Sequence, residues 1–198
     1  TACYDDFIRN NSIYRFYEIF SGYVKVFQQL NETIKSKKNV AHHYDLKEDL
    51  YKLFLDKDMQ YSCAYFHNEN ISLDQAQIDK KKHIINKLQI KENMSVLDIG
   101  CGWGGMALEI AKQTGAKVRG ITLSENQFAT ASRRAQEEGL SDKVSFQIQD
   151  YRDEKLKYDR IVSVGMFEHV GIKYFKPYLR KTYDLLKDNG VFLLHTIG

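Results

Sequence analysis

The chain has 198 residues, of which 43% are hydrophobic and 28% are charged, and its formal net charge is +3. This length and balance fit one domain with a full core and exclude a chain that is disordered throughout. No apolar run approaches the roughly 18 to 20 residues of a membrane-spanning helix. The cysteines Cys3, Cys63 and Cys101 are widely spaced and form no CxxC pair. This argues against a disulfide framework and against a metal site, and a reducing cytosol is the expected setting.

The first part of the chain is predicted to be helical. Apolar residues recur at three- and four-residue spacing between Ile13 and Leu30, which predicts an amphipathic helix. The basic, polar stretch at residues 35–39 is typical of a linker. The chain begins at Thr1 without a readable targeting leader, and we expect it to be an excised piece of a longer protein.

Two capping boxes follow. Asp45 with Glu48 predicts the start of a helix. Its apolar positions are Leu46, Leu50 and Phe54. Ser72 with Gln75 has the same spacing and predicts a second helix that extends to about residue 88.

From residue 95 onward the pattern changes to short apolar strands that alternate with helices. The predicted strands are residues 95–99, 117–121, 144–148, 160–164 and 190–195. The predicted helices are residues 104–113, 124–138 and 173–187, the last interrupted near Pro177. This alternation predicts an α/β fold with a parallel, doubly wound sheet.

The glycine-rich segment at residues 96–105 lies where a strand ends and a helix begins. Gly100, Gly102 and Gly105 satisfy the G-x-G-x-x-G fingerprint of dinucleotide sites. Asp98, Gly100, Gly102 and Gly104 equally form D-x-G-x-G-x-G, the first motif of class I methyltransferases. Asp98 favours the second interpretation, because its carboxylate can bind the ammonium of an amino-acid ligand and a dinucleotide has no such group. A turn that serves only the chain topology is the remaining alternative.

The end of the next strand lacks the acidic residue that a dinucleotide site requires about 20 positions further on. Many methyltransferases also place Asp or Glu where Thr122 stands, so here hydroxyl and amide groups are expected to hold the ribose. Thr122, Ser124 and Gln127 have the right chemistry and position. Ser124 and Gln127 also fit a helix cap, and the two roles are compatible.

The segment at residues 149–152 follows the third strand, where methyltransferases hold the adenine. Tyr151 offers a face for stacking, and Asp150 offers an acceptor for the amino group. A polar loop without a ligand explains the same spacing equally well.

Six blocks together resemble the cyclopropane-fatty-acyl-phospholipid synthases, and the mycolic acid cyclopropane synthases look similar but more distant. The blocks are residues 39–46 (NVAHHYDL), 59–66 (MQYSCAYF), 96–105 (VLDIGCGWGG), 120–124 (GITLS), 161–170 (IVSVGMFEHV) and 192–198 (FLLHTIG). The resemblance implies a Rossmann-like class I methyltransferase domain at residues 39–198, truncated at its C-terminus so that the last strands of the sheet are missing. Residues 1–38 are expected to be the helical tail of a smaller N-terminal domain.

The resemblance also implies a reaction, in which S-adenosylmethionine supplies a methylene group to the cis double bond of a phospholipid acyl chain. Bound bicarbonate then acts as the base. The cradle of this anion is expected to comprise Cys63, Glu168, His195 and Ile197, with a further tyrosine beyond Gly198. Besides the residues discussed above, the expected cofactor contacts are Tyr61, Ser62, Trp103 and Leu123.

Each cradle residue also has a plainer interpretation. Cys63 fits a small buried hydrophobic residue, and His195 fits a hydrogen-bonded core histidine. The position of His195 at the carboxyl end of a parallel strand favours a ligand site.

The expected partners are a phospholipid bilayer surface and a second copy of the chain, but no nucleic acid. The expected location is the cytoplasm, at the inner face of the membrane. Two other functions remain open at this point. One is methyl transfer to a soluble amine or hydroxyl group, and the other is a non-catalytic lipid-binding module.

Overall fold

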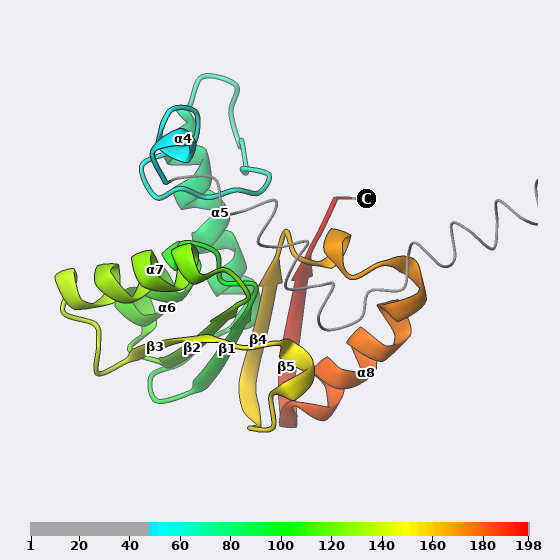
Figure 1. The fold of residues 1–198 in the computed structure, drawn as a ribbon. Coiled ribbons are helices and arrows are strands. Elements are labelled where there is room, and N and C mark those ends of the chain that lie inside the picture. The colour runs from blue at the N-terminus through cyan, green and yellow to red at the C-terminus, as the bar shows by residue number, and fades with distance from the viewer. Residues whose placement is uncertain (1–47, 198) are drawn as a thin grey trace, which may run out of the picture.

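The computed structural model describes residues 48–197, which form a single parallel sheet with helices on both faces (Figure 1). The predicted helix between Ile13 and Leu30, the linker and the proposed boundary after residue 38 lie outside the described residues. Within residues 48–197, no helix is both long and apolar enough to cross a membrane.

The sheet has five strands in the order β3-β2-β1-β4-β5. They are β1 (Ser95–Ile99), β2 (Lys117–Thr122), β3 (Val144–Ile148), β4 (Tyr158–Val164) and β5 (Leu186–His195). All four pairings are parallel, and Asp98 of β1 lies between Gly120 of β2 and Val162 of β4. The strand order reverses at the β1–β4 junction, so a crevice opens there at the carboxyl ends of the strands.

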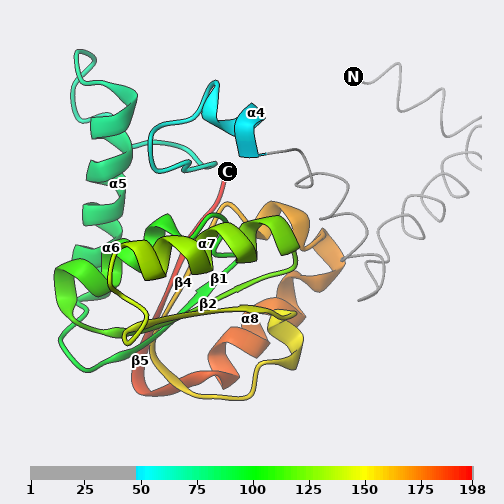
Figure 2. The same ribbon diagram turned by 60° about the vertical axis from the view of Figure 1, so that its left-hand side comes forward.

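Four helices cover the two faces of the sheet. They are α5 (Leu73–Leu88), α6 (Gly105–Thr114), α7 (Glu125–Glu137) and α8 (Phe175–Asp184). Ile84 of α5, Ala111 of α6 and Ala135 of α7 belong to one buried cluster, whereas Tyr178 of α8 belongs to the cluster on the other face. Figure 2 shows α6 and α7 on one side of the strands and α8 on the other. The prediction of a doubly wound α/β fold is therefore confirmed.

The predicted helix cap residues Ser72 and Ser124 are both confirmed. The Ser72 hydroxyl accepts a hydrogen bond from the Gln75 N–H at 3.2 Å, and the Ser124 hydroxyl accepts one from the Gln127 N–H at 3.3 Å. Each bond satisfies one backbone donor that the first turn of a helix leaves unpaired.

Several boundaries differ from prediction, and three of the differences have a visible physical reason. The helix predicted to carry Phe54 ends before it, since α4 spans Glu48–Lys52. Phe54 is 52% exposed, so it offers no buried face that would extend the helix. Pro177 does not interrupt a helix. It lies in the first turn of α8, where its missing N–H leaves no hydrogen bond unmade. Strand β5 begins at Leu186 and not at residue 190. Leu186 pairs with Tyr158 of β4, and a register shift then separates this pair from the next one, Val191 with Arg160.

Candidate functional site

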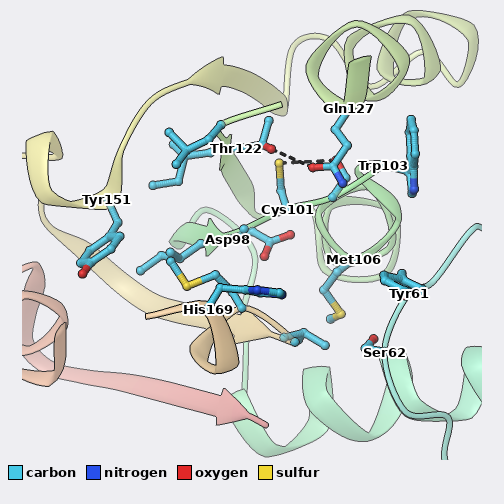
Figure 3. A pocket seen from close by; sticks show the side chains of 18 of the residues that line it. Tyr61, Ser62, Asp98, Cys101, Trp103, Met106, Thr122, Gln127, Tyr151 and His169 are labelled. Atoms are coloured by element: carbon cyan, nitrogen blue, oxygen red, sulfur yellow. Dashed lines mark hydrogen bonds between the residues drawn. The ribbon is translucent and has the colours of Figure 1, made fainter. Parts of the chain in front are cut away.

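A cavity of about 440 Å³ lies at the carboxyl ends of β1, β2 and β4 (Figure 3). All but two of the predicted cofactor residues line it. The predicted residues that line the cavity are Tyr61, Ser62, Asp98, Gly100, Gly102, Trp103, Thr122, Leu123, Gln127, Asp150 and Tyr151. The two exceptions are Gly104 and Ser124, which flank the cavity from α6 and α7 as N-cap residues.

Among the described residues that line this cavity, Asp98 is the carboxyl residue that keeps an unpaired oxygen. Its side chain is 1% exposed, and its Oδ2 atom has no hydrogen-bond partner among the described residues. Burial raises the pKa of Asp98 to about 7. A buried acceptor without a partner is costly, and an ammonium group from a ligand would both pair with it and favour its ionised form.

The glycine-rich loop passes from β1 to α6 through positive backbone φ angles. These are 77° at Gly100, 53° at Gly102 and 87° at Gly104. A Cβ atom on Gly102 would meet no described atom within 4 Å, whereas one on Gly104 would lie 2.8 Å from the Phe146 ring and 2.9 Å from Ala131. Gly102 therefore leaves open space for a ligand, and Gly104 permits close helix packing.

The predicted ribose contacts form a linked polar group. The Thr122 hydroxyl donates to Gln127 Oε1 at 2.8 Å and accepts from the Ser124 N–H at 3.2 Å (Figure 3 shows the Thr122–Gln127 bond). Ser124 thus caps α7, and its N–H also orients the Thr122 hydroxyl, whereas its contact with a ribose stays a prediction.

Asp150 also lines the cavity, and its buried carboxylate already accepts hydrogen bonds from Arg152. Its Oδ1 accepts from Arg152 Nε at 2.9 Å, and its Oδ2 accepts from Arg152 Nη2 at 2.6 Å. The Tyr151 ring packs against Tyr178 with the centroids 4.9 Å apart and a 69° interplanar angle. Tyr151 is thereby held in place as one wall of the cavity.

The four residues predicted to hold bicarbonate lie beside the cavity, and none of them is among the described residues that line it. Glu168 Oε1 accepts a hydrogen bond from the Ile197 N–H at 2.8 Å. Burial, the largest single influence, favours the neutral form of Glu168. This bond, further hydrogen bonds from the Glu168 N–H and Thr196, and the charge of His169 together outweigh it, so the pKa of the carboxyl lies below its usual value. Cys63 is an exposed free thiol.

His195 ends β5 next to the cavity. Its backbone carbonyl accepts from the N–H of Gly165, which does line the cavity, at 3.0 Å. The His195 Nδ1 atom is buried and has no hydrogen-bond partner among the described residues. Burial and the nearby Lys80 ammonium lower the pKa of His195, while Glu168 opposes this change. His195 is therefore close to both charged groups.

Several cavity residues had no predicted role. Met166 and His169 lie in the quoted 161–170 block, and Arg152 lies in the quoted 149–152 segment, so their positions after strand ends were the available signal. Lys80 is not among the residues that line the cavity but contacts one that does, and it carried no such signal. Its residue is only 3% exposed, and its ammonium donates to the Ser62 hydroxyl at 2.7 Å.

The sheet order, the glycine-rich loop and the cavity at the β1–β4 junction define a Rossmann-like class I methyltransferase fold. Among known families, the model of mycolic acid cyclopropane synthetase matches residues 31–198. The chain belongs to this family.

Individual relatives agree with this assignment. The chain is 48% identical over 169 residues to the cyclopropane-fatty-acyl-phospholipid synthase of Escherichia coli K12, covering 83% of this chain and 43% of that protein. The solved structure of the cyclopropane synthase MmaA2 from Mycobacterium tuberculosis has a TM-score of 0.78 and 37% identity, covering 81% of this chain and 56% of that one. The mycolic acid cyclopropane synthase CmaA1, complexed with SAH and CTAB, has a TM-score of 0.77 and 35% identity, covering 80% and 55%. The chain thus spans less than half of the E. coli relative.

Proposed function

We propose that this chain is the catalytic part of a cyclopropane-fatty-acyl-phospholipid synthase, with residues 39–198 as its cofactor-binding domain. The observation that carries the proposal is the unpaired, buried Oδ2 of Asp98 inside the cavity. This acceptor fits the ammonium group of S-adenosylmethionine. The relatives described above are named as cyclopropane synthases. When bound, this cofactor supplies an electrophilic methyl group on a sulfonium centre.

In this proposal each part of the cavity has one task. Asp98 binds the ammonium, Thr122 and Gln127 bind the ribose, and Tyr151 packs against the adenine. Tyr61, with its side chain 56% exposed, lies at the mouth of the cavity. An alkene is a weak nucleophile, so the wall must also exclude water and align the reacting carbons.

Bicarbonate is the proposed base, held beside the cavity by Glu168 and His195. An ionised Glu168 can accept the bicarbonate O–H, and the unpaired Nδ1 of His195 offers a second hydrogen bond. The Ile197 N–H donates a hydrogen bond to the Glu168 carboxylate, so Ile197 acts by orienting that carboxylate. Cys63 directly follows Ser62, which lines the cavity, and this supports its assignment to the cradle.

The acceptor is proposed to be an unsaturated acyl chain of a phospholipid at the inner surface of a bilayer, approached by a homodimer in the cytoplasm. Exposed apolar side chains follow α4, with Leu53 at 81% and Phe54 at 52% exposure. Figure 1 shows this segment beyond the carboxyl ends of the strands, and the cavity-lining residues 59–62 follow it in the chain. Apolar side chains around a site entrance suit contact with lipid.

The test is an assay with phospholipid vesicles that contain cis-unsaturated chains, S-adenosylmethionine and bicarbonate. A gain of one CH₂ with loss of the double bond supports the proposal. Methylation of soluble amines or alcohols alone would favour the first alternative, and binding of vesicles without any binding of S-adenosylhomocysteine would favour the non-catalytic one. Glu168→Gln should slow turnover sharply with nearly unchanged cofactor affinity; an equal loss of both would contradict the assigned role.

A further inference from the structure

The segment at residues 58–62 lies on the cavity and is fixed by several partly buried polar contacts. Met59, Gln60, Tyr61 and Ser62 line the cavity. The preceding Asp56 is 6% exposed, and its carboxylate accepts from the Gln60 N–H at 2.7 Å. The segment contains no helix or strand, so its shape depends on these side-chain bonds.

One face of α5 supplies three of these bonds. Gln77 donates to the Ser62 carbonyl at 3.0 Å, Lys80 donates to the Ser62 hydroxyl at 2.7 Å, and Lys81 donates to Asp58 Oδ2 at 2.6 Å. Each of the three helix residues is at most 4% exposed. Two adjacent buried lysines, Lys80 and Lys81, are rare, because desolvation of an ammonium must be offset by specific partners.

Arg134 of α7 differs from the three α5 residues, because it contacts a second part of the cavity wall as well as the 58–62 segment. Its guanidinium pairs with Asp58 Oδ1 and donates through Nη1 to the Trp103 carbonyl at 2.9 Å. Trp103 belongs to the glycine-rich loop and lines the cavity. One side chain thus joins the 58–62 segment to the loop that holds the cofactor. Figure 3 shows Trp103, Tyr61 and Ser62 along the same side of the cavity.

Two further observations indicate that this junction is fitted closely. A Cβ atom on Gly105, the first residue of α6, would collide with the side chains of Asp58 and Gln60. Burial alone would raise the pKa of Asp58, but the charges of Lys81 and Arg134 reverse this and lower it, so the carboxylate stays ionised as their common partner.

We propose that Arg134 is a positioning residue for the cofactor, because it holds the 58–62 segment and the Trp103 carbonyl in the one arrangement that shapes this side of the cavity. The inference rests on the proposed function only for the identity of the ligand, S-adenosylmethionine. Without the guanidinium, both parts of the wall lose a fixed partner, and binding must then order them at a cost in affinity. The planar fork matters, because an ammonium cannot reach two acceptors in the same geometry.

The test compares Arg134→Met with Arg133→Met, a matched control on the same helix whose exposed guanidinium pairs with Glu137. Titration calorimetry with S-adenosylhomocysteine should give an affinity about tenfold lower for Arg134→Met and an unchanged one for Arg133→Met. Arg134→Lys should rescue part of the loss. Trp103, the single tryptophan, gives a ligand-free readout: its fluorescence should be quenched more readily by acrylamide in Arg134→Met.

The outcomes separate the two proposals. If the unaltered chain does not bind S-adenosylhomocysteine, the proposed function fails, while the Trp103 quenching still decides the role of Arg134. If the chain binds and Arg134→Met binds within twofold of Arg133→Met, with only its melting temperature lowered, the positioning role is overturned. Should Arg134→Met not fold, Arg134→Lys carries the test, and unchanged affinity in that variant overturns the inference.

Discussion

Replacing Asp98 by Asn should remove a pH dependence of stability that the buried carboxyl creates. Its pKa of about 7 in the fold lies well above the ordinary value of 3.8 for an aspartate. A raised pKa means that the protonated form stabilises the fold, so this stability is fully present below the unfolded value and is lost as the pH rises through 7. At 1.36 kcal/mol per unit, the whole effect is about 4 kcal/mol, of which about 3 kcal/mol falls between pH 5 and pH 8.

The assay is urea or thermal unfolding of both proteins without ligand at pH 5 and pH 8. The unfolding free energy of the unaltered chain should fall by about 3 kcal/mol relative to Asp98→Asn over this interval, or about 6 to 12 °C in melting temperature. Histidines titrate in both proteins, so their contribution cancels in the comparison. Parallel stability curves for the two proteins would refute the reasoning.

The same carboxyl should make ligand binding depend on pH. A ligand ammonium requires ionised Asp98, so S-adenosylhomocysteine should bind about tenfold more weakly at pH 6 than at pH 8. Asp98→Asn should lose this dependence and bind about 30-fold more weakly at pH 8, for a charge-assisted hydrogen bond of about 2 kcal/mol. Calorimetry at the two pH values measures both effects, and equal affinity of the two proteins would contradict the assigned partner.

Two further variants test neighbouring features. Gly102→Ala should weaken S-adenosylhomocysteine binding by tenfold or more, whereas Gly139→Ala should not. Both glycines have φ angles above 50° and no described atom within 4 Å of a new Cβ, so backbone strain is matched, and equal affinities would place the ligand elsewhere. Lys80→Met should raise the pKa of His195 in a proton NMR titration, because the ammonium holds it down; the exposed Lys82→Met is the control, and an unmoved His195 would show that Lys80 does not act on it.

Local patterns were sufficient to predict the parts of the fold that depend on neighbours in sequence. Asp98 and the glycines after it could be predicted to form a turn at the end of a strand, because a short strand, a tight turn and a helix follow each other within a few residues. Ser72 and Ser124 could be predicted as caps for the same reason, since the donor each one binds is three positions away. The register shift in β5 was not visible, because it depends on pairing with β4.

The buried polar face of α5 could not be predicted at all. Lysine is rarely buried, so Lys80 and Lys81 would be assigned to the solvent side of a helix. Their partners, Ser62 and Asp58, lie 18 and 23 residues away along the chain. They approach the two lysines only when the 58–62 segment packs against α5 and the start of α6. Gly105 likewise fits the dinucleotide fingerprint in sequence, and only the fold assigns it to the approach of Asp58.

The strand order has a consequence for how such a catalyst can diversify. In the proposed assignment, the residues for the methyl donor come mainly from β1, β2 and the turns after them, a continuous stretch of chain on one side of the central junction. Glu168 and His195 come from the ends of β4 and β5, on the other side. New methyl acceptors can therefore be accommodated by exchanging the two later strand ends, while the donor site is inherited unchanged.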